Sequence, residues 1–159
     1  MTPITLESIK SDADALAAKI ATFEAQANQP AAEFYFPEVT IHLLPGEHYA
    51  GLIVGKDGEP SHHLVLLPSQ ADDITWDKAM EWAAKQGGEY VASLPTRREQ
   101  SLLYANLKDQ FEVRWYWSCE AHESESGWAW CQLFDYGHQD TYHEGYELRA
   151  RAVRRLVIQ

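Results

Sequence analysis

The chain has 159 residues, 45% of them hydrophobic, which is enough for one ordinary domain with its own core and a short accessory element. Its 13 basic and 24 acidic residues give a formal net charge of −11. This negative charge disfavours binding to nucleic acid phosphates or to anionic membrane surfaces. No stretch approaches the roughly 20 apolar residues that span a bilayer, and the first residues lack the features of a signal peptide. We therefore expect a cytoplasmic protein that neither enters membranes nor binds nucleic acid.

The first segment carries a helical repeat. From Leu6 to Ala27, apolar residues recur at alternating spacings of three and four, which is the seam of a coiled coil. Thr2 suits the start of this helix, and Asn28 predicts its end. We assign residues 1–29 to a helix that joins copies of the chain in a parallel dimer or trimer; the alternative is a helix docked on its own domain. The seam consists of Leu6, Ile9, Ala13, Leu16, Ile20, Phe23 and Ala27.

Residues 30–159 have the pattern of a mixed domain that begins with strands. Apolar and polar residues alternate over residues 39–43, which predicts a strand. Two further strands, residues 49–54 and 63–67, flank Asp57-Gly58, a dipeptide that favours a tight hairpin turn. Later strands are predicted over residues 115–121, 127–136 and 148–158.

Two short helices lie between these groups of strands, so we expect an α+β fold. Thr75 suits the N-cap of the first helix, and Gly87-Gly88 suits its end because glycine adopts the left-handed conformation. Thr96 and Glu99 form a capping box, in which each side chain satisfies a backbone N–H group of the other residue. The second helix is therefore expected from Arg97 to about Lys108.

The two cysteines permit two interpretations. Cys119 and Cys131 lie equally far from Glu125, so a hairpin that turns through residues 124–126 places them opposite each other. A disulfide between opposed strand residues is strained, because it needs Cβ atoms closer than most such pairs provide. We favour the second interpretation, in which both are half-buried free thiols.

Candidate catalytic and metal-binding residues are few. His122, His138 and His143 lie among carboxylates and supply the ligand types that zinc prefers, but their spacing matches no short metal-binding motif. The chain also lacks a nucleophile elbow, a phosphate-binding loop and a dinucleotide fingerprint. We therefore predict no catalytic residue, no metal site and no cofactor.

Aromatic and polar residues mix in a segment that we expect to be a polar loop used for recognition. Tyrosine has an apolar body and a polar tip, and such side chains are common in binding surfaces. The alternative is a tyrosine-rich loop that packs on its own domain. The tryptophans before this segment alternate in strands and are expected in the core. The candidate ligand-binding residues are His122, Glu123, Tyr136, His138, Gln139, Asp140, Tyr142, His143, Glu144 and Tyr146.

Arginines are concentrated in the last predicted strand. Arg149, Arg151 and Arg155 share one face by alternation, whereas Arg154 lies among small and apolar residues on the other. An arginine in such surroundings is usually half-buried and paired with a carboxylate, so we expect a structural role. The alternative is a phosphate or carboxylate ligand.

A family resemblance rests on several motifs in a fixed order. The chain resembles an uncharacterised bacterial and prophage domain family that is related to the C-type-lectin-like and formylglycine-generating-enzyme folds, over roughly residues 47–157. The resemblance implies two helices that flank a small twisted antiparallel sheet, a long ligand-facing loop region, and a location in a phage-infected host cell or in a virion. The motifs are Trp76-Asp-Lys-Ala-Met-Glu-Trp82, Gly87-Gly88, Ser93-Leu-Pro-Thr-Arg-Arg-Glu99, Trp115-Tyr-Trp-Ser118, Ala129-Trp-Cys-Gln132 and Arg151-Ala-Val-Arg-Arg155.

The chain departs from the active members of that superfamily. Oxidase members use a closely spaced cysteine pair, and calcium-dependent lectins use Glu-Pro-Asn and Trp-Asn-Asp motifs, which this chain lacks. Fold alone does not assign function. The leading hypothesis is an oligomeric, non-enzymatic phage or prophage module that binds a protein or glycan. The alternatives are a thiol- or metal-dependent enzyme built around Cys119, Cys131 and His122, and a purely structural virion protein.

Overall fold

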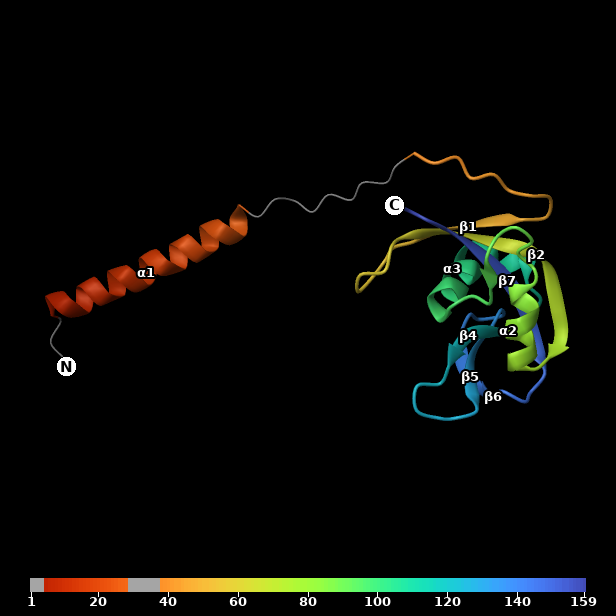
Figure 1. Ribbon diagram of the computed structural model, residues 1–159. Coiled ribbons are helices and arrows are strands. Elements are labelled where there is room, and N and C mark those ends of the chain that lie inside the picture. The colour runs from red at the N-terminus through yellow and green to blue at the C-terminus, as the bar shows by residue number, and fades with distance from the viewer. Residues whose placement is uncertain (1–4, 29–37) are drawn as a thin grey trace. The chain divides into compact units, whose positions relative to one another are not determined.

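The computed structural model describes residues 5–28 and 38–159, which fall into two units divided between Thr40 and Ile41 (Figure 1). The first unit contains helix α1, Leu6–Ala27. The predicted end of this helix is confirmed, with Asn28 as its C-cap. Its N-cap is Thr5, whose side chain accepts a hydrogen bond from the N–H group of Ser8, whereas Thr2 lies outside the described residues.

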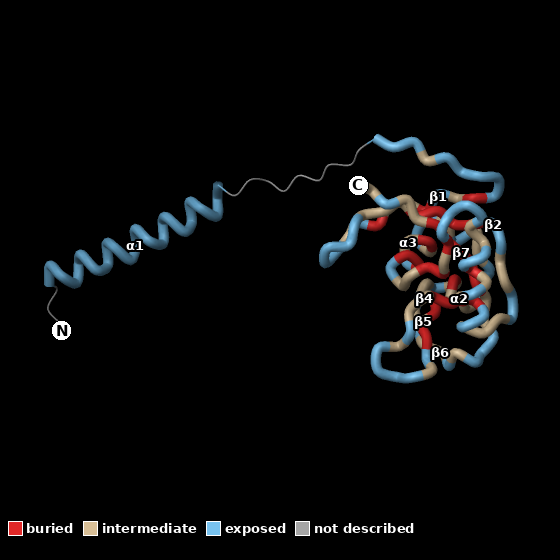
Figure 2. The backbone as a smooth tube through the Cα atoms, viewed as in Figure 1, coloured by how far each residue is buried: buried red, intermediate tan, exposed pale blue. Residues whose placement is uncertain are grey.

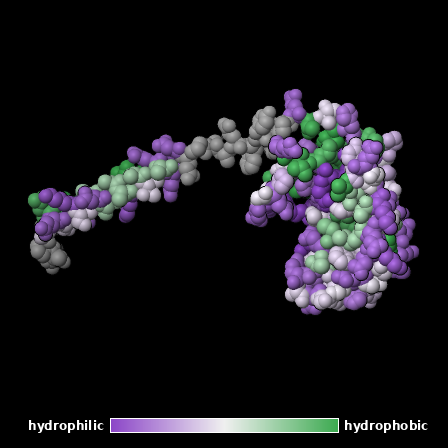
Figure 3. Space-filling model, in the orientation of Figure 1, coloured by the Kyte–Doolittle hydropathy of each residue, from purple (hydrophilic) through white to green (hydrophobic). Residues whose placement is uncertain are grey.

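No residue of α1 is buried, and the helix is drawn as exposed along its whole length (Figure 2). Apolar and polar residues both reach its surface (Figure 3). The exposed apolar side chains include Leu6, Ile9, Leu16, Ile20 and Phe23 of the predicted seam.

The second unit is built on a sheet whose strand order is β1-β2-β7-β4-β5-β6, with β3 paired to β7. Neighbouring strands are antiparallel except β4 and β7, which meet in parallel at Tyr116 and Arg149. The predicted α+β class is confirmed. The strands are β1 His48–Ile53, β2 His62–Ile74, β3 Ala92–Ser93, β4 Trp115–Ala121, β5 Trp128–Leu133, β6 Gln139–His143 and β7 Leu148–Val157; the helices are α2 Trp76–Ala84, α3 Arg97–Leu107 and the 3₁₀ turn η1 Lys108–Gln110.

Two apolar clusters form the core, on opposite faces of the sheet. Alternation along β7 sends Ala150 and Ala152 towards α2, and Val153 towards α3. Trp117 and Tyr116 of β4 divide between the same two clusters, and both are buried. The helices therefore cover opposite faces, and buried residues concentrate in the strands and on the inner sides of the helices (Figure 2).

The helix caps follow the predictions in part. The capping box of α3 is confirmed: Thr96 Oγ1 accepts from the N–H group of Glu99 at 3.2 Å, and Glu99 Oε2 accepts from that of Thr96 at 2.8 Å. Thr75 is the N-cap of α2, but its side chain makes no capping hydrogen bond. Gly88 has a φ of +58°, as its left-handed position after α2 requires.

The hairpin between β1 and β2 turns as predicted. Asp57 and Gly58 both have positive φ, 54° and 87°, and the N–H group of Glu59 donates to the carbonyl of Lys56. Strand β2 runs past its predicted end because its register shifts between Leu66 and Gln70, which accommodates the intervening proline.

The strand predicted over residues 39–43 is wrong. This segment has no strand structure. Hydrogen bonds from side chains attach it and the residues that follow it to the sheet instead. Arg154 donates to the carbonyl of His42 at 2.9 Å, and Glu47 accepts from the N–H group of Leu44 at 2.8 Å. Arg154 and Glu47 also form a buried ion pair at 2.7 Å, which confirms the structural role predicted for Arg154.

Candidate functional site

A pocket of about 850 Å³ opens beside the first turn of α3, between this helix and the β1–β2 hairpin. Ten of the twelve residues that line it are polar or charged. His62 and Arg155 come from the two long strands, and Glu120 and Gln139 come from β4 and β6. The pocket therefore collects side chains from four strands around the start of one helix.

Glu99 forms the floor of this pocket. Its carboxylate is 1% exposed and accepts hydrogen bonds from Arg155 Nε and Nη2, both at 2.6 Å. His62 Nε2 lies 2.7 Å from Oε1, so this nitrogen carries the proton and donates to the carboxylate. Burial alone would raise the pKa of Glu99, but Arg155, the N–H group of Thr96 and His62 together hold it below its ordinary value.

Arg97 forms the side of the pocket and joins three elements. Its backbone N–H group donates to the carboxylate of Glu120 at 2.5 Å, and its Nε donates to Oε1 of Gln139 at 3.1 Å. Gln139 in turn donates from Nε2 to the carbonyl of Arg97 at 2.7 Å. The guanidinium lies 3.5 Å above the ring of Trp130, which adds a cation–π contact.

Trp130 extends the site onto strand β5. Its ring stacks with His122 at 5.7 Å and 12°, and its Nε1–H group donates to Glu123 at 3.2 Å. Arg97, Trp130, His122 and Glu123 therefore hold one another beside the pocket.

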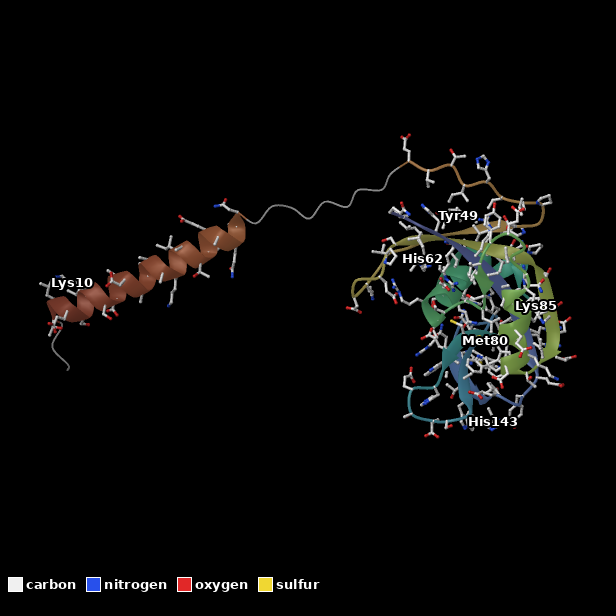
Figure 4. The ribbon with its side chains drawn as sticks, viewed as in Figure 1. Lys10, Tyr49, His62, Met80, Lys85 and His143 are labelled. Carbon is white, nitrogen blue, oxygen red and sulfur yellow. The ribbon has the colours of Figure 1, made fainter. Side chains whose placement is uncertain are left out.

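Strands β5 and β6 present an aromatic and polar face next to this cluster. Trp128 pairs with His143, and Trp130 pairs with Thr141, so alternation places all four on one face. We call these four residues the β5–β6 face. Trp128 is 37% exposed, and its ring meets that of His143 edge to face at 5.9 Å. His62 lies beside α3, and His143 lies at the far end of β6 (Figure 4).

The candidate residues predicted from sequence are distributed unevenly. Glu123 and Gln139 contact Arg97, which the prediction missed, and His122 stacks with Trp130, whose ring Arg97 covers. Among the others, five are exposed: Tyr136, His138, Asp140, His143 and Tyr146. Glu144 is half-buried, and its carbonyl accepts from the N–H group of Trp76 at 3.1 Å.

The predicted polar loop is wrong for residues 139–143, which form β6. Pairing with β5 orders this segment, and the side chain of Asp140 satisfies the N–H group of Thr141 at 2.8 Å. Tyr142 is half-buried and packs against Trp115 at 5.3 Å and Tyr146 at 5.8 Å. It therefore packs partly inward, whereas His143 on the other face is exposed.

The tryptophans predicted for the core also divide. Trp117 is buried, but Trp128 and Trp130 reach the surface on the β5–β6 face. Alternation along β5 predicts that Trp128 and Trp130 share a face of the sheet. It does not predict whether a helix covers that face. Arg97 was missed for a similar reason, because its position just after the N-cap does not reveal that β6 lies beside it.

The cysteines do not oppose each other. Cys131 pairs with Trp117, because the register of β4 shifts between Trp117 and Ala121, and both cysteines are free. Burial raises the pKa of the Cys119 thiol to about 11, although Arg155 opposes this rise. Burial also raises the pKa of Cys131. Both thiols are therefore protonated at neutral pH, and the thiolate is the reactive form of cysteine.

Within residues 5–28 and 38–159, no group of three or more His, Cys, Asp or Glu side chains is arranged to hold a metal ion. No helix in the same described parts has both the length and the apolar character needed to cross a bilayer. In comparisons of the sequence with known proteins, neither a family model nor a curated protein matches the chain.

Proposed function

We propose that this protein is a non-enzymatic binding module that recognises a protein or glycan through the pocket beside α3 and the adjoining β5–β6 face. The observation that carries this proposal is the arrangement around Arg97. Its side chain is held by Gln139 and Trp130 at the edge of an 850 Å³ pocket before any ligand binds. A preorganised site of this kind loses less conformational entropy on binding.

The chemistry of the site favours recognition over catalysis. Its nearest thiol, Cys119, has its pKa raised to about 11 by burial, which leaves little thiolate to act as a nucleophile. The carboxylate on the floor, Glu99, is already engaged by Arg155, His62 and the helix N-cap. The groups that remain at the surface are aromatic rings and hydrogen-bonding side chains, which serve binding.

The proposal includes display of the domain as a homo-oligomer. Helix α1 exposes the large apolar side chains of a heptad seam, and burying them between copies would be favourable. Several domains on one stem would bind a repeated ligand with higher avidity than one domain alone.

The finer fold and the setting are part of the same proposal. Two helices on opposite faces of a small sheet, with a capping box before α3, are compatible with a C-type-lectin-like domain. The resemblance of the sequence motifs to prophage domains supports a role in a phage tail or against a host factor inside the cell. Fold likeness alone would not assign either role.

A selection experiment with matched variants tests the binding function. A random peptide library and an array of neutral and acidic glycans are screened with the full chain. We expect binders whose affinity falls when Trp128 and His143 are both changed to alanine. The matched control changes Tyr49 and His63 to alanine, because this pair has the same ring separation of 5.9 Å at the other end of the sheet. Binders that respond to the control pair and not to the test pair would contradict the proposal.

A further inference from the structure

The pocket beside α3 contains the guanidinium of Arg97, whose Nη1 forms a long ion pair with Glu123 but makes no hydrogen bond. Arg97 uses its backbone N–H group for Glu120 and its Nε for Gln139. Its Nη1 lies 3.6 Å from Glu123, beyond hydrogen-bonding distance, and the side chain is 33% exposed. Among the described residues, neither Nη atom of Arg97 makes a hydrogen bond. These two nitrogens form the fork that binds a carboxylate through two parallel hydrogen bonds.

The other arginines of the pocket are engaged. Arg155 gives Nε and Nη2 to Glu99 and Nη1 to the hydroxyl of Ser93. Arg98 donates from Nη2 to the carbonyl of Val54 at 3.0 Å, so its two Nη atoms are not both available to one carboxylate. Arg97 is therefore the cation best placed to meet an anionic ligand, and its contact with Trp130 fixes its plane.

The rest of the wall suits hydroxyl groups. His62 protonates Nε2 to bind Glu99, which leaves Nδ1 as an acceptor, and Glu120 uses only Oε2 for Arg97. Among the described residues, no hydrogen bond engages His62 Nδ1 or Glu120 Oε1. Ser101 adds a hydroxyl at the rim. A ring that carries several hydroxyl groups would find two acceptors on the wall of the same pocket.

The same wall is poorly suited to a peptide. An extended peptide would add to the edge of strand β1, but α3 already satisfies carbonyls along that edge. Asn106 donates to Ala50 at 2.7 Å, and Arg98 donates to Val54. Only two of the lining residues are apolar, Ile53 and Pro60, whereas an aromatic anchor of a peptide needs a cluster of apolar side chains around it.

We propose that this pocket binds an acidic sugar, whose carboxylate is held by the two Nη atoms of Arg97 and whose hydroxyls donate to His62 and Glu120. This inference rests on the proposed binding function and names its ligand class. The overall charge of −11 repels an acidic ligand at long range, so recognition depends on short-range contacts within the pocket.

The test uses the full chain and paired probes. The methyl glycosides of glucuronic, galacturonic and N-acetylneuraminic acids are each compared with their uncharged carboxamides, at physiological salt, by NMR titration. At least one acid should bind about tenfold more tightly than its carboxamide, because a charge-assisted pair is replaced by a neutral one. The shifted signals should include the amides of residues 97–101 and the indole N–H of Trp130.

Variants give a second, independent readout. Arg97→Gln should weaken binding of the acid about tenfold, whereas Arg114→Gln, which removes the same charge from an exposed arginine, should not. Glu123→Gln should strengthen binding of the acid, because it removes the negative charge 3.6 Å from Arg97 Nη1 and keeps an acceptor for Trp130. This last variant and the acid–carboxamide comparison keep the test valid if Arg97→Gln fails to fold.

The outcomes distinguish the acidic-sugar inference from the proposed binding function. Equal affinity for acid and carboxamide, or an unchanged affinity in a folded Arg97→Gln variant, would overturn the acidic-sugar inference. Neutral glycans or peptides that bind the same pocket would overturn it and leave the binding function standing. If none of these sugars binds and no library member maps to the pocket or the β5–β6 face, both proposals fail.

Discussion

At the scale of single residues, Glu99 both caps its own helix and binds two residues that are distant in the sequence. The sequence could predict its capping role, because Thr96 and Glu99 are three residues apart in a recognisable motif. It could not predict that Arg155 and His62 bind the same carboxylate, because they lie 56 and 37 residues away in the chain. Only the pairing of β2 with β7 brings them to α3.

Because Glu99 has both roles, two variants should lower the free energy of unfolding by different amounts. Thr96→Ala removes one capping interaction and should lower the free energy of unfolding by about 0.5–2 kcal/mol. Glu99→Gln also leaves Arg155 without its carboxylate, and losing one partner of a buried pair costs about 3–5 kcal/mol. Urea unfolding of both variants measures the difference. Equal losses would show that Glu99 acts only as a cap.

The buried carboxylates also set the acid stability. The pKa of Glu99 and the pKa of Glu47, which Arg154 lowers through hydrogen bonds, are both below the ordinary value of 4.5. Each carboxylate therefore contributes stability that is fully present above pH 4.5 and is lost as the pH falls through its lower, folded-state pKa.

We expect the free energy of unfolding to fall steeply below pH 4.5 in the wild type and less steeply in Glu99→Gln. Measuring urea unfolding at closely spaced pH values between 3 and 6 compares the two slopes. Parallel slopes would assign the acid sensitivity to other groups.

At the scale of elements, periodicity predicted α1, α3 and β4 well because their patterns are local. It failed for residues 39–43, where alternation is present but side chains, and not a neighbouring strand, hold the segment. It also failed for β6, which is polar and becomes a strand only because β5 pairs with it. Local patterns also could not predict how the candidate site assembles. They identified His122, Glu123 and Gln139 individually, but only the pairing of strands brings these residues to Arg97 and Trp130.

The two faces of β6 predict opposite effects of neighbouring substitutions. Tyr142 packs against Trp115 and Tyr146, so Tyr142→Ala should lower the melting temperature. His143→Ala, on the exposed face, should weaken ligand binding at an unchanged melting temperature. Thermal unfolding and titration of both variants distinguish the roles. If Tyr142→Ala lost binding without losing stability, the recognition role predicted for Tyr142 would return.

At the scale of the whole molecule, the higher avidity that we propose depends on α1 joining several domains. Leu16→Asp combined with Ile20→Asp should dissociate the oligomer, because the change places charges in the buried seam. Ala18→Asp with Ala21→Asp adds the same charge outside the seam and is the matched control. Light scattering at micromolar concentration reads the mass. A monomeric wild type would refute the oligomeric stem and leave the isolated domain as the binding unit.

The central claim is that the pocket beside α3 and the β5–β6 face form one ligand-binding surface. Hydrogen exchange of the full chain with and without a ligand from the library or array tests it most directly. We predict slower exchange in residues 97–101, 120–123 and 139–143, with little change in β1. Protection confined to other parts of the domain, while these three segments exchange as before, would contradict the account.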